Sequence, residues 1–192
     1  MELKEKQKKI LDVAVELFKE KGYMGSSVRD LATKLNIKAA SLYAHIHSKE
    51  EILEWICFGI AQEFFDELQE VKSTNIPPKE KLNLFIEKHL SVVLKNRDVT
   101  HIYSNEWKHL EERLPEFVEL RKKYQQEVEQ LISEIYQAEN WELKSPTFTT
   151  RFILHTLNNS YFWFKRNIES TTEIPDEIRD KILFGLLGNQ KQ

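Results

Sequence analysis

The feature that most constrains this chain is its small number of helix-breaking residues. Five glycines and five prolines occur among 192 residues, less than half the share of about 12% that they take in an average chain. Sandwiches, barrels and collagen-like folds need many turn-forming residues. The hydrophobic content of 41% is too high for a disordered chain. We therefore predict a fold built from long helices.

The prolines divide the chain into blocks whose apolar residues recur with the helical period of 3.6 residues. No proline interrupts an apolar pattern, and each suits the start of a helix, where a missing amide N–H costs little. The pattern predicts an all-α fold with nine helices and no strand. The expected helices end near Gly22, follow Ser27, span about 38–46, follow Ser48, follow Pro78, span about 98–110, and begin at Pro115, Pro146 and Pro175.

Composition also restricts compartment and chemistry. The single cysteine, Cys57, excludes an internal disulfide framework and a cysteine zinc site. No run of about 18 uncharged apolar residues occurs, so we expect no membrane span and no membrane partner. The chain is charged from Glu2 onward and lacks the apolar core of a signal peptide. We expect a cytoplasmic protein that needs no cofactor.

Catalytic and metal-binding motifs are missing from the sequence. It contains no glycine-rich phosphate loop, nucleophile elbow or HExxH motif. Glu106 and His109 form half of a di-iron carboxylate pattern, but the second Glu-x-x-His that such a site needs is absent. His45 and His47 are two residues apart and do not share a helix face. We expect no catalytic and no metal site. The alternatives are a helical di-metal carboxylate enzyme and a helical interaction module that does not bind DNA.

The charge is distributed unevenly along the chain. The formal net charge is −3, but residues 1–50 hold ten Lys and Arg against seven Asp and Glu, a net charge of +3. The remainder therefore has a net charge of −6. A basic segment at one end is compatible with a nucleic-acid partner.

Two short helices within this basic segment predict a helix-turn-helix. Ser27 and Asp30 have the spacing of a capping box, and Asn36 tolerates the left-handed backbone of a tight turn. The second helix has an apolar side that includes Leu42. Its other side carries only small or hydrogen-bonding residues, as entry into a major groove requires.

The sequence from Ile10 to Leu53 resembles the TetR family of repressors. The landmarks are Ile10-Leu11-x-x-Ala14-x-x-Leu17-Phe18-x-x-x-Gly22-Tyr23, Ser27-Val28-Arg29-Asp30-Leu31-Ala32, Leu35-Asn36-Ile37, Ser41-Leu42-Tyr43-x-His45-Ile46 and Ser48-Lys49-Glu50-Glu51-Ile52-Leu53. The family usually has glycine where Asn36 stands. The resemblance implies a nine-helix TetR-like fold with a helix-turn-helix head at 1–48 and a ligand-binding and dimerisation domain at 49–192, connected by a helix at 49–72.

The resemblance also implies roles in binding double-stranded DNA at a palindromic operator. Residues facing base edges would be Lys38, Ala39, Ala40 and Ser41. Residues near the DNA backbone would be Ser27, Arg29, Tyr43, His45 and Lys49. The alternatives are a core role for Tyr43 and ordinary solvated charge for the two lysines. Because the reading helix lacks arginine, the commonest partner of guanine, we predict modest base readout and strong salt dependence.

The remaining helices carry the residues expected to bind an effector and to pair two copies of the chain. The resemblance implies an apolar ligand pocket, for which the candidates are Trp55, Phe58, His89, Tyr103, Trp107, Arg121, Tyr124, Asn158 and Trp163. It also implies a homodimer formed by the last two helices, for which the candidates are Phe148, Phe152, His155, Asn159, Phe162, Ile182 and Leu186. Packing within the chain's own core is the alternative for both sets.

Looser motifs in the C-terminal part favour one branch of the family. Leu157-Asn158 with Trp163, Glu173-Ile174 and Leu183-x-Gly185-Leu186, together with Glu106-x-x-x-Leu110 and Arg121-x-x-Tyr124, resemble the branch that responds to acyl-coenzyme A. The expected function is therefore a repressor that a small hydrophobic molecule, acyl-CoA or fatty-acid-like, releases from its operator. Such a ligand needs an apolar tunnel, with basic residues near Arg121 for the phosphates.

Overall fold

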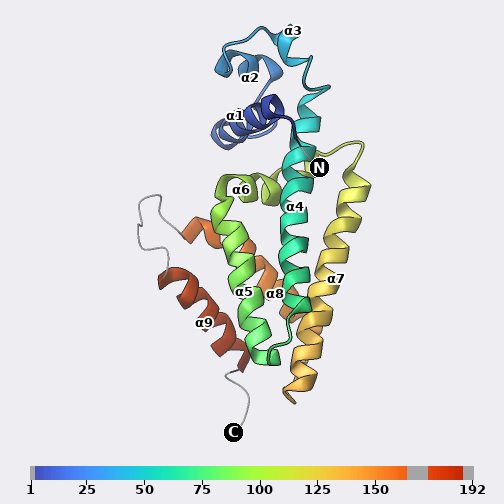
Figure 1. The fold of residues 1–192 in the computed structure, drawn as a ribbon, viewed down its shortest axis with the longest axis vertical. Helices are drawn as coiled ribbons and strands as arrows, with labels where there is room; N and C mark the ends of the chain where they lie inside the picture. The colour runs from blue at the N-terminus through green and yellow to red at the C-terminus, as the bar shows by residue number, and fades with distance from the viewer. Residues whose placement is uncertain (1–2, 164–172, 188–192) are drawn as a thin grey trace. The chain divides into compact units, whose positions relative to one another are not determined.

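A computed structural model describes residues 3–163 and 173–187 of the chain. Within these ranges it contains only helices, drawn in Figure 1, which confirms the all-α prediction. The elements are α1 (Glu5–Lys21), α2 (Val28–Lys34), α3 (Ala39–Leu42), α4 (Lys49–Ser73), α5 (Pro78–Lys95), α6 (Arg97–Asn105), η1 (Trp107–His109), α7 (Leu114–Ala138), α8 (Pro146–Asn159), η2 (Ser160–Trp163) and α9 (Glu173–Leu187). Among the described helices, none is both long and apolar enough to span a membrane.

The helix starts follow the prolines. Helices α5 and α8 begin at Pro78 and Pro146, and α7 begins one residue before Pro115. Helix α9 begins at Glu173, two residues before the expected start at Pro175. Ser145 caps α8 by accepting a hydrogen bond from the Phe148 amide at 3.3 Å. The first turn of a helix leaves its amide N–H groups without intrahelical partners, so proline loses nothing there.

Two predicted helices are shorter than the apolar pattern suggested. The helix expected at about 38–46 is α-helical only over Ala39–Leu42, and the His45 amide then donates to the Leu42 carbonyl in a tighter turn. The helix expected at 98–110 ends at Asn105 and continues as a 3₁₀ turn. Apolar spacing continues through such turns, so periodicity alone does not show where the α-helical hydrogen bonds stop.

The chain forms two compact units. The first comprises residues 1–62 and 96–120, and the second comprises residues 63–95 and 121–192. In the first unit α1 packs against α2 and α6, and α2 packs against α3. Its core includes Ile10, Ala14, Leu17, Phe18, Leu31, Leu42 and Ile46. These compact units differ from the expected domains at 1–48 and 49–192, which were defined by function. The boundary between residues 48 and 49 stays a prediction.

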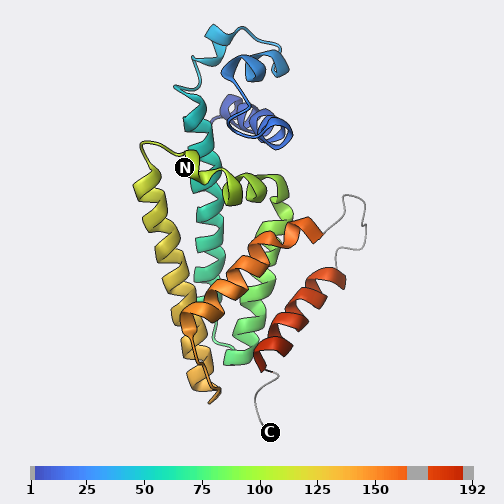
Figure 2. The same cartoon turned by 180° about the vertical axis from the view of Figure 1, so that it is seen from behind.

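The second unit is a helical bundle in which α5 packs against both α8 and α9 (Figure 2). Its core is aliphatic except for a few aromatic and polar residues, and includes Leu82, Phe85, Ile86, Leu90, Val93, Val128, Leu131, Ile132, Ile153, Leu157, Ile178 and Ile182. Helices α4 and α7 each contribute residues to both units.

Candidate DNA-reading head and effector site

A capping box fixes the start of α2. The Asp30 amide donates to Ser27 Oγ at 3.1 Å, and the Ser27 amide donates to the Asp30 carboxylate at 2.9 Å. Lys21 Nζ lies 2.8 Å from Asp30 Oδ1. The hydrogen bonds from Lys21 and then Ser27 lower the pKa of Asp30 to about 2. The predicted capping box is confirmed, and its carboxylate also ties α2 to the end of α1.

The turn between α2 and α3 has the predicted left-handed residue. Asn36 has φ of 53°, and the next amide, that of Ile37, donates to the Ala32 carbonyl at 3.0 Å. Asparagine tolerates this conformation because its short polar side chain can hydrogen-bond locally. The turn therefore closes without the glycine that the family usually has there.

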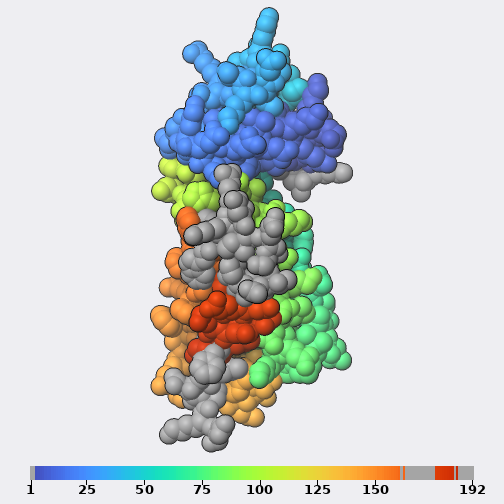
Figure 3. Space-filling view, turned by 90° about the vertical axis from the view of Figure 1, so that its left-hand side faces the viewer, coloured from blue at the N-terminus to red at the C-terminus, as the bar shows by residue number. Residues whose placement is uncertain are grey.

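The predicted reading residues lie on the surface of the first unit. The exposed ones are Ser27, Arg29, Lys38, Ala40, Ser41 and Tyr43, and Ala39 is half-buried. Leu42 is buried, as expected for the inner side of α3. Tyr43 is 54% exposed, so the alternative of a core aromatic does not hold for it. Figure 3 shows side chains of the light-blue α2–α3 segment projecting from this unit.

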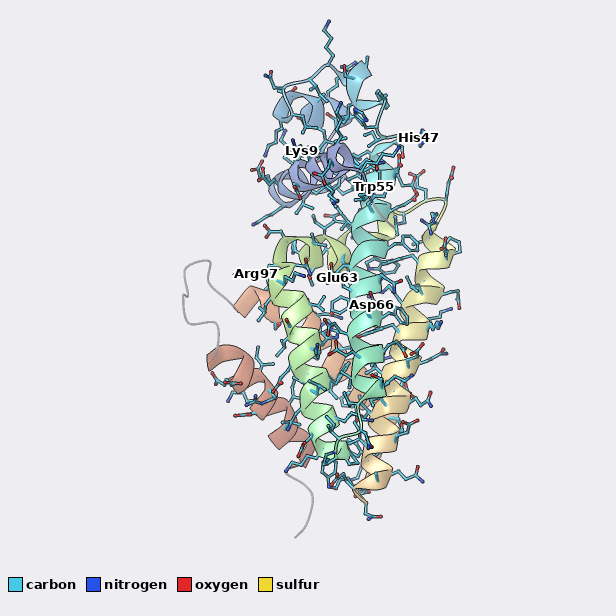
Figure 4. The ribbon with its side chains drawn as sticks, in the orientation of Figure 1. Lys9, His47, Trp55, Glu63, Asp66 and Arg97 are labelled. Atoms are coloured by element: carbon cyan, nitrogen blue, oxygen red, sulfur yellow. The ribbon has the colours of Figure 1, made fainter. Side chains whose placement is uncertain are left out.

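The ends of the reading segment are held by neighbouring helices. Gln7, on the first turn of α1, donates through Nε2 to the His45 carbonyl at 3.4 Å. The Glu51 amide donates to Ser48 Oγ at 3.1 Å, as predicted for the cap of α4. The Glu51 carboxylate, however, accepts from the amide of His47 at 2.6 Å. His47 is labelled in Figure 4. The cap of α4 thus extends one residue further back than the expected box.

Lys49 occupies a position that sequence reasoning did not anticipate. Its ammonium donates to the Tyr23 carbonyl at 2.7 Å and to the Ser26 carbonyl at 2.8 Å. It also lies 4.0 Å from the centre of the Tyr23 ring. Burial lowers the pKa of Lys49, and the charge of Glu106 opposes this shift. Two of its three N–H donors thus hold the α1–α2 turn against α4, and the expected phosphate contact stays a prediction.

Tyr23 links this turn to η1. Its ring stacks on that of His109 with centroids 5.6 Å apart, and burial raises its pKa to about 12. His109 Nε2 lies 3.4 Å from Glu106 Oε2. Within the described residues no three His, Cys, Asp or Glu side chains come close enough to hold a metal ion.

Four predicted effector residues lie in the first unit. Phe58, Tyr103 and Trp107 surround Phe117, with ring centroids 5.2, 5.8 and 6.3 Å from it. Trp55, labelled in Figure 4, is buried on α4. Phe117 is fully buried, and sequence reasoning missed it although it lies two residues after Pro115, on the first turn of α7. This cluster has the close aromatic packing expected of a core.

Three other predicted effector residues meet in the second unit. His89 on α5 is 2% exposed. Its Nδ1 lies 3.0 Å from Tyr124 Oη on α7, and its Nε2 lies 3.0 Å from Asn158 Oδ1 on α8. An amide oxygen can only accept, so Nε2 carries the imidazole proton and Nδ1 accepts from the Tyr124 hydroxyl. We call this directed set of hydrogen bonds the Tyr124–His89–Asn158 chain.

The surroundings of His89 are aromatic. Phe64 stacks on the imidazole with centroids 4.4 Å apart, and Phe85 lies at 5.8 Å. Phe65 packs edge-on against Tyr124 at 5.2 Å. Burial lowers the pKa of His89 to about 4, and the hydrogen bond with Asn158 opposes this shift. The imidazole is therefore neutral at pH 7. The three phenylalanines were not among the predicted effector residues.

Two predicted effector residues remain outside this set. Arg121 is half-buried on α7, one turn before Tyr124, where residues three apart share a helix face. The side chain of Trp163 lies outside the described residues.

Two predicted dimer residues, one helical turn apart, form an exposed apolar stripe on α8; pairing of two copies through this stripe stays a prediction. Phe148 is 70% exposed and Phe152 is 50% exposed, one helical turn apart. Phe162 is 63% exposed, and Asn159 Nδ2 donates to the carbonyl of the exposed His155 at 2.8 Å. Ile182, by contrast, is buried within the chain, so the core alternative holds for it. The Leu186 side chain lies outside the described residues.

These features agree with the families that the chain matches. Residues 10–56 match the family model described as bacterial regulatory proteins, tetR family. Residues 75–186, more than half of the chain, match the model described as tetracyclin repressor-like, C-terminal domain. The chain belongs to the TetR family. The predicted family is confirmed, and with it the prediction that the chain is a regulator and not an enzyme.

Curated relatives match parts of this TetR-family chain. The repressor KstR2 of Mycolicibacterium smegmatis is 33% identical over 122 residues, 62% of this chain and 58% of that protein. KstR2 of Rhodococcus jostii is 30% identical over 101 residues, 53% of this chain and 50% of that protein. The biofilm-operon regulator IcaR of Staphylococcus aureus is 54% identical over 46 residues, 24% of this chain and 25% of that protein. The chain thus spans about half the length of the KstR2 proteins it matches.

Solved structures match nearly the whole chain. PfmR of Thermus thermophilus is 26% identical with a TM-score of 0.81, covering 95% of this chain and 99% of that one. AibR, solved in complex with isovaleryl coenzyme A and operator DNA, is 25% identical with a TM-score of 0.80, covering 95% of this chain and 98% of that one. KstR2 of Mycobacterium tuberculosis has a TM-score of 0.84 at 21% identity, covering 97% and 95%.

Proposed function

We propose that this protein is a homodimeric repressor that binds a palindromic operator and is released by a hydrophobic effector, with acyl-coenzyme A as the favoured class. The observation that carries the proposal is the exposed α2–α3 segment, which presents small and hydrogen-bonding residues within the span that matches the family's regulatory domain. Its site of action would be the chromosome in the bacterial cytoplasm. The similarity to AibR, which was solved with isovaleryl coenzyme A, supports the ligand class.

In the head at 1–48, one set of residues would contact bases and another set would contact phosphates. Lys38, Ala39, Ala40 and Ser41 would face base edges in the major groove, and Lys38 is the strong donor among them. Tyr43 and His45, with Ser27 and Arg29 at the start of α2, would contact phosphates. Since phosphate contacts release counterions, affinity should fall steeply with salt.

Dimerisation would use the exposed apolar stripe on α8. Large aromatic side chains left exposed in a row mark interaction sites, and a two-fold interface places the same stripe on both protomers. Replacing Phe148 and Phe152 with glutamate should give a monomer in gel filtration that no longer shifts a palindromic DNA. Gln137→Glu, on the exposed side of α7, is the matched control and should stay dimeric.

Release would follow from a change in the spacing of the two heads. Successive major grooves on one side of DNA are about 34–36 Å apart, so a dimer must hold its reading helices at that spacing. We propose that the connecting helix at 49–72 pivots when ligand binds in the domain at 49–192. The ligand can shift this equilibrium only by its difference in affinity for the two states.

The decisive experiment selects operator fragments from a random DNA library with the full chain and measures their binding by fluorescence anisotropy at two salt concentrations. Palindromic fragments that are lost with added acyl-CoA support the proposal. If the chain binds DNA but no acyl-CoA, fatty acid or other apolar molecule releases it, the DNA-binding part of the proposal stands and the effector class is contradicted. No DNA binding even at low salt would favour an interaction module and contradict the proposal.

A further inference from the structure

The Tyr124–His89–Asn158 chain places polar atoms deep in an apolar bundle. Burying polar groups is costly unless each is hydrogen-bonded. Tyr124 and both ring nitrogens of His89 meet this condition. Asn158, which is half-buried, accepts through Oδ1, but among the described residues its Nδ2 amide has no acceptor. The chain of hydrogen bonds thus ends in two N–H donors.

We propose that the Asn158 amide donates a hydrogen bond to an uncharged carbonyl oxygen of the effector, so that this site selects a thioester, ester or ketone over a free acid or a hydrocarbon. The inference rests on the proposed function, because it names the chemical group that the effector site recognises. Tyr124 and His89 act as positioning residues. Their hydrogen bonds hold Oδ1 of Asn158 toward the imidazole, so Nδ2 of Asn158 points away from it.

The surroundings of the chain favour a neutral acceptor. The rings of Phe64, Phe85 and Tyr124 pack against His89, and none of them carries a charge at pH 7. A carboxylate placed here would lose its hydration and gain only neutral partners, which is unfavourable. Tyr124 on α7 bonds one ring nitrogen of His89, and Asn158 on α8 bonds the opposite one. A carbonyl loses little hydration and gains a donor.

Pairs of ligands that differ only at the carbonyl can measure its contribution to binding. An acyl-CoA and the S-alkyl-CoA of the same chain length differ at the thioester carbonyl and share the coenzyme. Dissociation constants should be measured by calorimetry on the full chain for butanoyl, decanoyl and hexadecanoyl CoA, for the three alkyl analogues and for the three free acids. For the length that fits, we expect the acyl-CoA to bind about tenfold more tightly than the alkyl analogue, the effect of one hydrogen bond. The free acid should bind more weakly still.

Variants test whether Asn158 is the donor. Asn158→Leu should abolish the preference, so that acyl- and alkyl-CoA bind equally. Asn158→Asp keeps an acceptor for His89 but removes the N–H donors, and it should lose the preference as well; it serves if the leucine variant does not fold. Thr156→Ala, half-buried on the same helix, is the matched control and should keep the tenfold difference.

The outcomes separate this inference from the proposed function. Equal binding of acyl- and alkyl-CoA by the wild-type chain would overturn the carbonyl assignment and leave the coenzyme ligand standing. A preference that persists in both Asn158 variants would overturn the role of Asn158. Binding of neither class by a chain that still binds its operator would overturn the ligand class and this inference together.

Discussion

Replacing Lys49 with methionine would separate two roles for this residue. Methionine keeps an unbranched apolar side chain of similar length but removes every N–H donor. The variant loses the bonds to the carbonyls of Tyr23 and Ser26 and the contact with the Tyr23 ring. The Ser26 carbonyl then has no other protein donor among the hydrogen bonds of the described residues, whereas the Tyr23 carbonyl still accepts from the Ser26 amide.

The expected loss of stability follows from these contacts. A hydrogen bond from a charged group contributes about 1.5–3 kcal/mol, and an exposed cation–π contact about 0.5–1 kcal/mol. Lys49 is only partly buried, so solvent screens its charge and water can replace part of each bond. We therefore expect a net loss of about 2 kcal/mol in the free energy of unfolding. For a chain of this size, that lowers Tm by about 4–8 °C.

The assay combines thermal unfolding with the salt dependence of operator binding. If Lys49 acts mainly as a clamp, Lys49→Met lowers Tm and leaves the slope of log K against log salt unchanged. If it contacts a phosphate instead, Tm stays constant and the slope falls by about 0.9. Lys38→Met is the control, since Lys38 is exposed; its Tm should not change. A Lys49→Met variant that melts within about 1 °C of the wild type would refute the clamp.

Three further predictions concern stability. The pKa of His89 is lowered to about 4 from 6.5, so the neutral imidazole contributes its full stabilisation above pH 6.5. Between pH 6.5 and pH 4 the free energy of unfolding should fall by up to about 1.4 kcal/mol per pH unit. In urea titrations, His89→Phe should show a weaker dependence on pH over this range. The pKa of Asp30 is lowered to about 2 from 3.8, so its contribution persists above pH 4, and Asp30→Asn should melt lower than wild type at pH 5 but not at pH 2. A Cβ on Gly25 would lie 2.3 Å from the Lys21 carbonyl oxygen, so Gly25→Ala should lower Tm, whereas Gly59→Ala, which has open space, should not.

Local chemistry accounts for what the sequence predicted well. The cap of α2 depends on Ser27 and Asp30, three residues apart, and the α2–α3 turn depends on one residue that tolerates positive φ. Both are decided by neighbours in sequence, so spacing and residue type suffice. The same holds for Pro78 and Pro146 at the starts of α5 and α8.

Features decided by distant contacts escaped prediction. The family resemblance implies a phosphate contact for Lys49, which stays a prediction, but did not indicate the contacts that Lys49 makes within the chain. Its actual acceptors are 26 and 23 residues away, carbonyls that become available only when the α1–α2 turn folds back on α4. Phe117 was likewise not singled out from the other apolar residues of the chain. Its central place among Phe58, Tyr103 and Trp107 depends on how three segments pack.

The Tyr124–His89–Asn158 chain shows both cases in one set of residues. The sequence marked His89 and Asn158 as polar residues on apolar helices and Tyr124 as an aromatic residue, and the family resemblance made all three candidates for the ligand pocket. That they are partners of one another could not be predicted, because they are 35 and 69 residues apart. Each residue turns a helix by about 100°, so a small rotation of α5, α7 or α8 would break the chain of hydrogen bonds. The position of the Asn158 amide therefore depends on the packing of all three helices.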